Sequence, residues 1–81
     1  MRAWGVVNQD VVVYVAQGCH LCDAALEVVR DVCGDAFSVV DITGDPVLER
    51  AYRERIPVVE VDGRASFTYF VHPDALRSAV A

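Results

Sequence analysis

The sequence has no hydrophobic run long enough to cross a bilayer or to form the core of a secretion signal. Its longest apolar run covers residues 11–16, whereas a transmembrane helix needs about 20 apolar residues. The N-terminal segment is interrupted by Gly5, which argues against a signal peptide. No lipidation motif is present either. We therefore expect a cytoplasmic protein that is not bound to a membrane.

The sequence also has no cluster of basic side chains. Asp and Glu number 12 against 7 for Lys and Arg, which gives a formal net charge of −5. An acidic domain repels phosphate backbones and anionic lipids, so we expect no nucleic-acid partner. With 81 residues, 54% of them hydrophobic, the chain fits one compact domain. So small a core buries only about 60% of the unfolded chain's surface, which limits stability.

The cysteine count does not fit the even disulfide framework of a small secreted protein. There are three cysteines, and two of them, Cys19 and Cys22, have the Cys-x-x-Cys spacing. In a reducing compartment this spacing indicates redox chemistry or metal binding. The sequence has no second Cys-x-x-Cys pair and no His-x-x-x-His pair. Because structural zinc sites use four protein ligands, the redox interpretation is the stronger one.

Strand and helix patterns alternate along most of the chain. The β-branched and aromatic run at 11–15 predicts a strand that is covered on both faces. Asp45 and Pro46 are a typical helix cap and first helical residue, and Asp62-Gly63 is a strong hairpin signal. The expected strands are 11–15, 37–42, 57–61 and 65–70, and the expected helices are 20–33, 46–54 and 72–80. We expect residues 11–81 to form a single domain and residues 1–10 to be a tail or an extra edge.

The predicted order of these elements is βαβαββα. Strands joined through a helix lie parallel, so the first two strands are expected to be parallel neighbours. The last two strands form an antiparallel hairpin. The sequence therefore predicts an α/β fold in which a four-stranded mixed sheet is covered by three helices.

The Cys-x-x-Cys pair lies where the first strand ends and the first helix begins. Residues three apart on a helix face the same side and can form a disulfide. The positive end of the helix dipole stabilises a thiolate, and cysteines in this setting have pKa values of about 3.5–7.5. Cys19 precedes the first turn and is the predicted attacking thiolate, whereas Cys22 is the shielded resolving thiol. Gly18 leaves room for a substrate to approach the sulfur.

Two further residues on this helix have alternative interpretations. A protonated His20 would favour the thiolate or relay a proton, or it is simply an exposed side chain. Cys33 lies roughly 16 Å along the helix axis from Cys22, which excludes a disulfide between them. We interpret Cys33 as a packed apolar residue, with an intermolecular or regulatory thiol as the alternative.

The chain resembles the glutaredoxin branch of the thioredoxin superfamily in the order of its elements and in residues 13–15, 19–22 and 55–63. More closely, the chain is similar to small bacterial glutaredoxin-like proteins with a Cys-His-Leu-Cys site, over roughly residues 11–80. The resemblance implies a thioredoxin-like (glutaredoxin) fold in which Pro57 is cis and lies against the cysteines. An alternative is that Pro57 merely begins an edge strand. It further implies that the backbone of Ile56 pairs with the substrate backbone. The predicted substrate-binding residues are Gly18, His20, Ile56 and Pro57.

The chain departs from the glutaredoxin pattern at positions that bind glutathione. Ala16 and Gln17 stand where typical members have Lys and Pro, and residues 67–72 lack a Gly-Gly turn. Pro73 removes a further backbone N–H group. Arginines could replace the missing carboxylate partners, and the candidates are Arg53, Arg55 and Arg64.

The leading hypothesis is a monomeric thiol–disulfide oxidoreductase that reduces protein or glutathione mixed disulfides. The resemblance implies that glutathione or a flavoprotein reductase restores the dithiol. We expect no metal and no tightly bound cofactor, with glutathione as a candidate reductant.

Two other classes of function remain as alternatives. One is a metal-binding module. It would be either a zinc site in which His20 or His72 joins the two cysteines, or an iron–sulfur cluster bridged in a dimer by Cys19 and glutathione. The other is a non-catalytic interaction domain that uses exposed aromatic side chains, for which the candidates are Trp4, Tyr69 and Phe70. Against this last use, Tyr69 and Phe70 are expected to occupy the two faces of the fourth strand.

Overall fold

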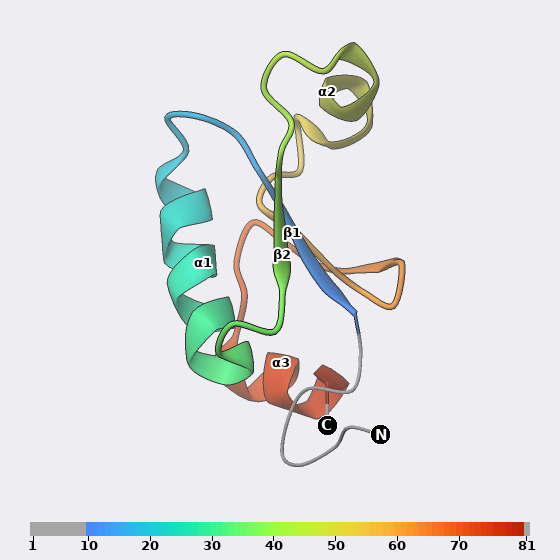
Figure 1. The fold of residues 1–81 in the computed structure, drawn as a ribbon. Helices are drawn as coiled ribbons and strands as arrows, with labels where there is room; N and C mark the ends of the chain where they lie inside the picture. Colours follow the sequence, from blue (N-terminus) through green and yellow to red (C-terminus); the bar gives the residue numbers. More distant parts are fainter. Residues whose placement is uncertain (1–9, 81) are drawn as a thin grey trace.

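The computed structural model describes residues 10–80, which form a four-stranded sheet with three helices (Figure 1). The elements are β1 (Val11–Val15), α1 (His20–Cys33), β2 (Ser38–Asp41), α2 (Pro46–Tyr52), β3 (Val58–Val61), β4 (Arg64–Thr68) and α3 (Pro73–Val80). The predicted order βαβαββα is therefore confirmed. The prediction of a tail or edge at residues 1–10 lies, apart from Asp10, outside the described residues.

The strands are arranged in the order β2-β1-β3-β4. β1 is parallel to β2 and antiparallel to β3, and β3 is antiparallel to β4. The mixed sheet is thus the one that the sequence predicts. The hairpin turn is formed by Asp62 and Gly63, with φ values of 55° and 82°, and such left-handed pairs match the twist of antiparallel strands. Within residues 10–80, no helix is both long and apolar enough to span a bilayer.

The end of α1 and the start of α2 carry typical capping residues, whereas α2 ends at Tyr52, two residues before the expected end at 54. Gly34 ends α1 with φ 63° and donates its N–H to the carbonyl of Arg30 at 2.8 Å. At the start of α2, Asp45 accepts the N–H groups of Val47 and Leu48 at 3.0 and 3.1 Å, and Pro46 takes the first helical position. A side-chain cap of this kind contributes about 1 kcal/mol to helix stability.

The core lies between one face of the sheet and the helices α1 and α3. Alternate residues of β1 and β3 point into it, as the period of two in a strand requires. Its buried members are Val11, Val13, Ala25, Val29, Cys33, Val59, Val61, Val71, Leu76 and Val80. Within residues 10–80, no charged side chain is buried, so the packing of this face is entirely apolar.

The other face of β1 is covered less than the sequence predicts, and the expectation of full cover on both faces is wrong. Val12 and Tyr14 on this face are only half-buried. The reason is that α2 has no buried residue and lies beyond the end of β2, away from α1 and α3 (Figure 1). Val47 of α2 is 76% exposed. The apolar spacing of α2 therefore does not mark a core helix.

A polar aromatic cluster joins α2 to this second face. The rings of Tyr14 and Tyr52 stack with their centroids 4.1 Å apart. Both hydroxyls donate to the carboxylate of Glu60, at 3.2 Å from Tyr14 and 2.8 Å from Tyr52. The two bonds satisfy the half-buried carboxylate and fix the end of α2 against β1 and β3.

We expect Tyr52→Phe to lower the free energy of unfolding by about 1 kcal/mol, as measured by urea unfolding. The hydrogen bond to Glu60 raises the pKa of Tyr52 well above its usual value. In the unfolded chain a tyrosine ionises at about pH 10. The stabilisation from this bond is therefore complete below that pH and declines as the pH rises beyond it. The phenylalanine variant should lack this loss of stability at alkaline pH. If the free energy of unfolding falls equally steeply with pH above about pH 10 in both proteins, the role given to the Tyr52–Glu60 bond is wrong.

Candidate functional site

The cysteine pair occupies the N-terminal turn of α1. The structure joins Cys19 and Cys22 in a disulfide, with their Cα atoms 5.2 Å apart. Cys19 is the N-cap residue, with extended φ and ψ of −103° and 106°, and its Sγ accepts the N–H of Cys22 at 3.1 Å. A donor at the positive end of a helix stabilises negative charge on that sulfur. Cys22 is only 2% exposed, whereas Cys19 is half-buried. The two residues therefore differ in burial, and Cys22 is the shielded one, as the sequence predicts.

Gly18 sets the direction in which the chain enters α1. Its φ is 74°, in the left-handed region that glycine adopts without strain. No atom lies within 4 Å of the place where a Cβ would stand. The space beside Cys19 is thus open, and a side chain at this position is disfavoured by backbone conformation rather than by a clash.

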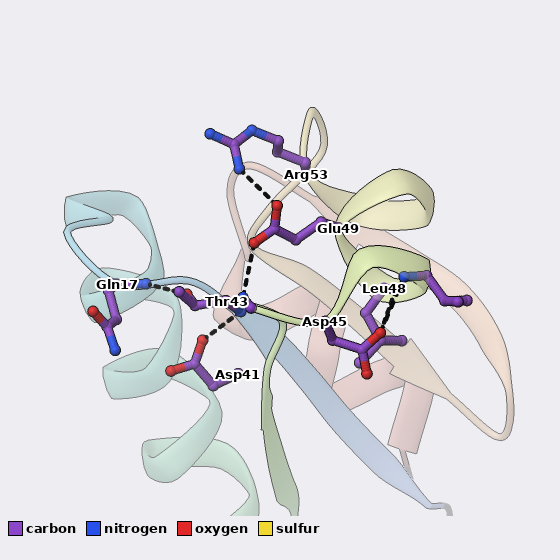
Figure 2. A network of polar contacts seen from close by, with 9 residues as sticks. Gln17, Asp41, Thr43, Asp45, Leu48, Glu49 and Arg53 are labelled. Atoms are coloured by element: carbon purple, nitrogen blue, oxygen red, sulfur yellow. Dashed lines mark hydrogen bonds and ion pairs between the residues drawn. The ribbon is translucent and has the colours of Figure 1, made fainter.

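A hydrogen-bond network fixes the loop that precedes Cys19 (Figure 2). Thr43 Oγ1 accepts the N–H of Gln17 at 3.1 Å, and the N–H of Thr43 donates to Asp41 Oδ1 at 2.9 Å. The hydrogen bonds from Thr43 hold the pKa of Asp41 below its usual value. Thr43 belongs to no motif in the sequence. The signal was its place just after β2, because the carboxyl ends of the parallel strands β1 and β2 meet at one edge of the sheet.

The same network continues into α2 and forms one wall of a hollow beside Cys19. Glu49 accepts the N–H of Gly44 at 2.9 Å and forms an ion pair with Arg53 at 3.1 Å, as Figure 2 shows. The hollow has a volume of about 370 Å³. Its lining residues are Ala16, Gln17, Gly18, Cys19, Ile42, Thr43, Glu49, Arg53 and Ile56. Two predicted site residues, Gly18 and Ile56, therefore meet Cys19 around one cavity.

The Ile56–Pro57 peptide bond is cis, as the family resemblance implies. Pro57 is buried and immediately precedes β3, which lies between β1 and β4 in the sheet. The alternative that it begins an edge strand is therefore wrong. The carbonyl of Pro57 accepts the N–H of Tyr69 at 3.0 Å. Ile56 itself forms no hydrogen bond through its backbone N–H or C=O with any residue of 10–80.

A second hollow, of about 320 Å³, lies between α1 and the segment that leads into α3. Three exposed apolar side chains line it, and they are Leu21 at 40%, Tyr69 at 45% and Phe70 at 64% exposure. The expectation that Tyr69 and Phe70 occupy two faces of the fourth strand is wrong, because β4 ends at Thr68. Tyr69 has φ 67°, which turns the chain out of the sheet.

The two histidines do not complete a metal site with the cysteines. His20 is exposed on the first turn of α1, and His72 is exposed just before α3, where it lines the second hollow. Within the described part of the chain, no three side chains of His, Cys, Asp or Glu are grouped so that they could hold a metal ion. The cysteine pair therefore lacks a third protein ligand among these residues.

The fold and the cysteine pair at the start of α1 define a protein of the thioredoxin-like class. The sequence profile of the glutaredoxin-like domain family (DUF836) matches residues 10–81. The chain therefore belongs to this glutaredoxin-like family. No curated protein is a significant match to it.

Two proteins of known structure are similar to this chain in both sequence and fold. Protein XcR50 of X. campestris, in its X-ray structure, is 32% identical with a TM-score of 0.74, and the match covers 84% of this chain and 91% of that one. Its solution structure gives a TM-score of 0.72 at the same 32% identity, over 85% of this chain and 88% of that one. Protein Ne2328 of Nitrosomonas europaea is 28% identical with a TM-score of 0.71, and each chain is covered over 100% of its length.

The third cysteine is separate from this site, and we expect it to be inert in the folded protein. Cys33 is 7% exposed and is a free thiol in the core. Burial raises the pKa of the Cys33 thiol, so the reactive thiolate is disfavoured. Iodoacetamide at pH 8 should leave the folded, oxidised protein unmodified and should add one group after unfolding in urea, as read by mass spectrometry. Cys33→Ala is the control and should gain none, whereas equally rapid modification of the folded protein would contradict this burial.

Proposed function

We propose that the protein is a thiol–disulfide oxidoreductase that reduces disulfides by dithiol exchange at Cys19 and Cys22. The observation that supports this most directly is the asymmetry of the pair. Cys19 Sγ accepts an N–H group at the N-terminus of α1 and borders an open hollow, whereas Cys22 is 2% exposed. An accessible sulfur with a stabilised negative charge suits nucleophilic attack, and a shielded neighbour within disulfide reach suits resolution.

The exchange balances in two steps. The Cys19 thiolate attacks one sulfur of the substrate disulfide, which forms a mixed disulfide and releases the other substrate sulfur as a thiolate. Cys22, after losing its proton, attacks Cys19 Sγ, which forms the Cys19–Cys22 disulfide and releases the second substrate thiolate. The substrate gains two electrons and the protein loses two. Glutathione or a flavoprotein reductase then supplies two electrons to restore the dithiol.

The backbone of Ile56 is the proposed contact for a peptide substrate. Its N–H and C=O are free of partners within residues 10–80, and the residue borders the Cys19 hollow. An extended substrate segment satisfies such free groups through strand-like hydrogen bonds. The proposal includes a cytoplasmic location, where a reducing environment maintains the dithiol.

The first alternative function is metal binding. A zinc site has less support than the oxidoreductase, because the cysteines lack a third protein ligand in the described part of the chain. An interaction domain without chemistry is separated from the enzyme by Cys19→Ser. Biological activity that survives this substitution would favour the interaction domain.

The first test is a redox titration of the purified protein in graded glutathione buffers, with free thiols counted by mass spectrometry. We expect a reversible change of two thiols in the wild-type protein. Cys22→Ser should instead accumulate a mixed disulfide between Cys19 and glutathione, because the resolving thiol is absent. Cys33→Ala is the control and should retain the two-thiol change. If no reversible change occurs across the cytosolic range of potentials, the proposal is wrong.

The second test concerns the charged ends of glutathione. Arg53 is the one candidate arginine that lines the Cys19 hollow, whereas Arg64 lies beside the β3–β4 turn. The Arg53 side chain is 70% exposed in its ion pair with Glu49, so a carboxylate contact there is worth only a modest energy. We expect Arg53→Gln to slow the reaction with glutathione disulfide by about two- to fivefold.

The uncharged 2-hydroxyethyl disulfide gives the comparison for this variant and should react at the wild-type rate. Arg64→Gln is the matched control and should change neither rate. Equal slowing of both disulfides by Arg53→Gln would show that the arginine does not recognise a carboxylate.

A further inference from the structure

A single residue holds both ends of the segment that carries Ile56. The N–H of Tyr69 donates to the carbonyl of Pro57 at 3.0 Å, and its hydroxyl donates to the carbonyl of Glu54 at 2.6 Å. Between these two anchored carbonyls lies Ile56, whose own N–H and C=O form no hydrogen bond within the described residues. Tyr69 thus bonds to a carbonyl on each side of the free Ile56 groups, through its backbone N–H on one side and its hydroxyl on the other.

Tyr69 adopts a costly conformation in making these bonds. Its φ is 67°, and the N–H of Phe70 donates to the carbonyl of Thr68 at 2.7 Å, which closes a γ-turn around Tyr69. This left-handed turn is rare and strained for a residue with a side chain. Such strain persists where surrounding contacts over-determine the conformation, and it gathers at functional sites. Here the contacts that oppose the strain are the two bonds to the Ile56 segment.

The other bonds of this segment come from α2 and do not reach Ile56. Arg55 donates its backbone N–H to the carbonyl of Tyr52 at 2.8 Å and its guanidinium to the carbonyl of Ala51 at 2.8 Å. These bonds fix the segment to the end of the helix. Tyr69 fixes it from the other side, to the end of β4. Loss of the Tyr69 hydroxyl would therefore free the carbonyl of Glu54 while the attachment to α2 remains.

We infer that Tyr69 is a positioning residue for substrate recognition, which holds the Ile56 backbone so that it can pair with a peptide backbone beside Cys19. The inference rests on the proposed function, since it concerns the substrate edge of the same site. It deepens that function by distinguishing two classes of substrate. A disulfide within a polypeptide has peptide groups to pair with Ile56, whereas a small organic disulfide has none. Tyr69 therefore matters for the first class only.

The test compares two disulfides in single-turnover reactions of the reduced protein. One is an uncharged pentapeptide, acetyl-Ala-Ala-Cys-Ala-Ala-amide, linked to a second copy through its cysteine. The other is 2-hydroxyethyl disulfide, which has no peptide group. Tyr69→Phe removes the hydroxyl and keeps the ring and the backbone N–H. We expect it to slow the peptide reaction by about fivefold, the effect of one hydrogen bond, and to leave the rate with 2-hydroxyethyl disulfide unchanged.

Tyr14→Phe is the matched control, because it also removes a tyrosine hydroxyl, bonded to Glu60 at 3.2 Å, and leaves in place the Tyr52–Glu60 bond that fixes α2. We expect it to change neither rate. Slowing of both disulfides by Tyr69→Phe, or of neither, would overturn the inference while leaving the proposed oxidoreductase intact. If the wild-type protein reduces neither disulfide, the proposed function itself fails and the inference fails with it. The rate with 2-hydroxyethyl disulfide also reports that each variant is folded.

Discussion

The position of β1 in the middle of the sheet is the constraint on which the site depends. β1 runs parallel to β2 and antiparallel to β3, with Val15 opposite Asp41 and Tyr14 opposite Val58. The end of β1, the end of β2 and the start of β3 therefore meet at one edge of the sheet. The loops that continue from them carry Cys19, Thr43 and Ile56, which lie around one hollow. Strand pairing therefore brings residues that are far apart in sequence to one end of the sheet, where side-chain hydrogen bonds hold their loops.

The site uses backbone groups that the regular elements leave without partners. The first turn of a helix has N–H groups with no intrahelical acceptor, and Cys19 Sγ accepts one of them from Cys22. Ile56 lies two residues before the start of β3, outside the strand, and its N–H and C=O form no hydrogen bond within the described residues. The chemistry at the sulfur and the proposed recognition of a peptide thus arise from the same condition, which is incomplete hydrogen bonding at the ends of elements.

Local signals in the sequence were sufficient for most of the fold. The run at 11–15, the Asp45-Pro46 helix start and the Asp62-Gly63 turn each report on a few neighbouring residues, and the structure agrees with them. Long-range polar contacts were not predictable in this way. The bonds from Gln17 to Thr43 and from Tyr69 to Glu54 join residues 26 and 15 positions apart. No period or spacing encodes such a pair.

The two errors in the predicted elements have one physical origin. β4 ends before Tyr69 because that residue bonds to the Ile56 segment instead of continuing the strand. α2 contacts the sheet through its last residue, Tyr52, whose hydroxyl is bonded to Glu60 of β3, while the helix itself has no buried residue. In both cases a tyrosine counts as apolar in the hydrophobic pattern, but the hydrogen bond of its hydroxyl determines where it lies. Hydrophobic patterning treats such a side chain as core, whereas its hydrogen bond determines where the element stops. Both tyrosines lie within two residues of an element's last residue, where a single bond can outweigh local propensity because few other contacts oppose it.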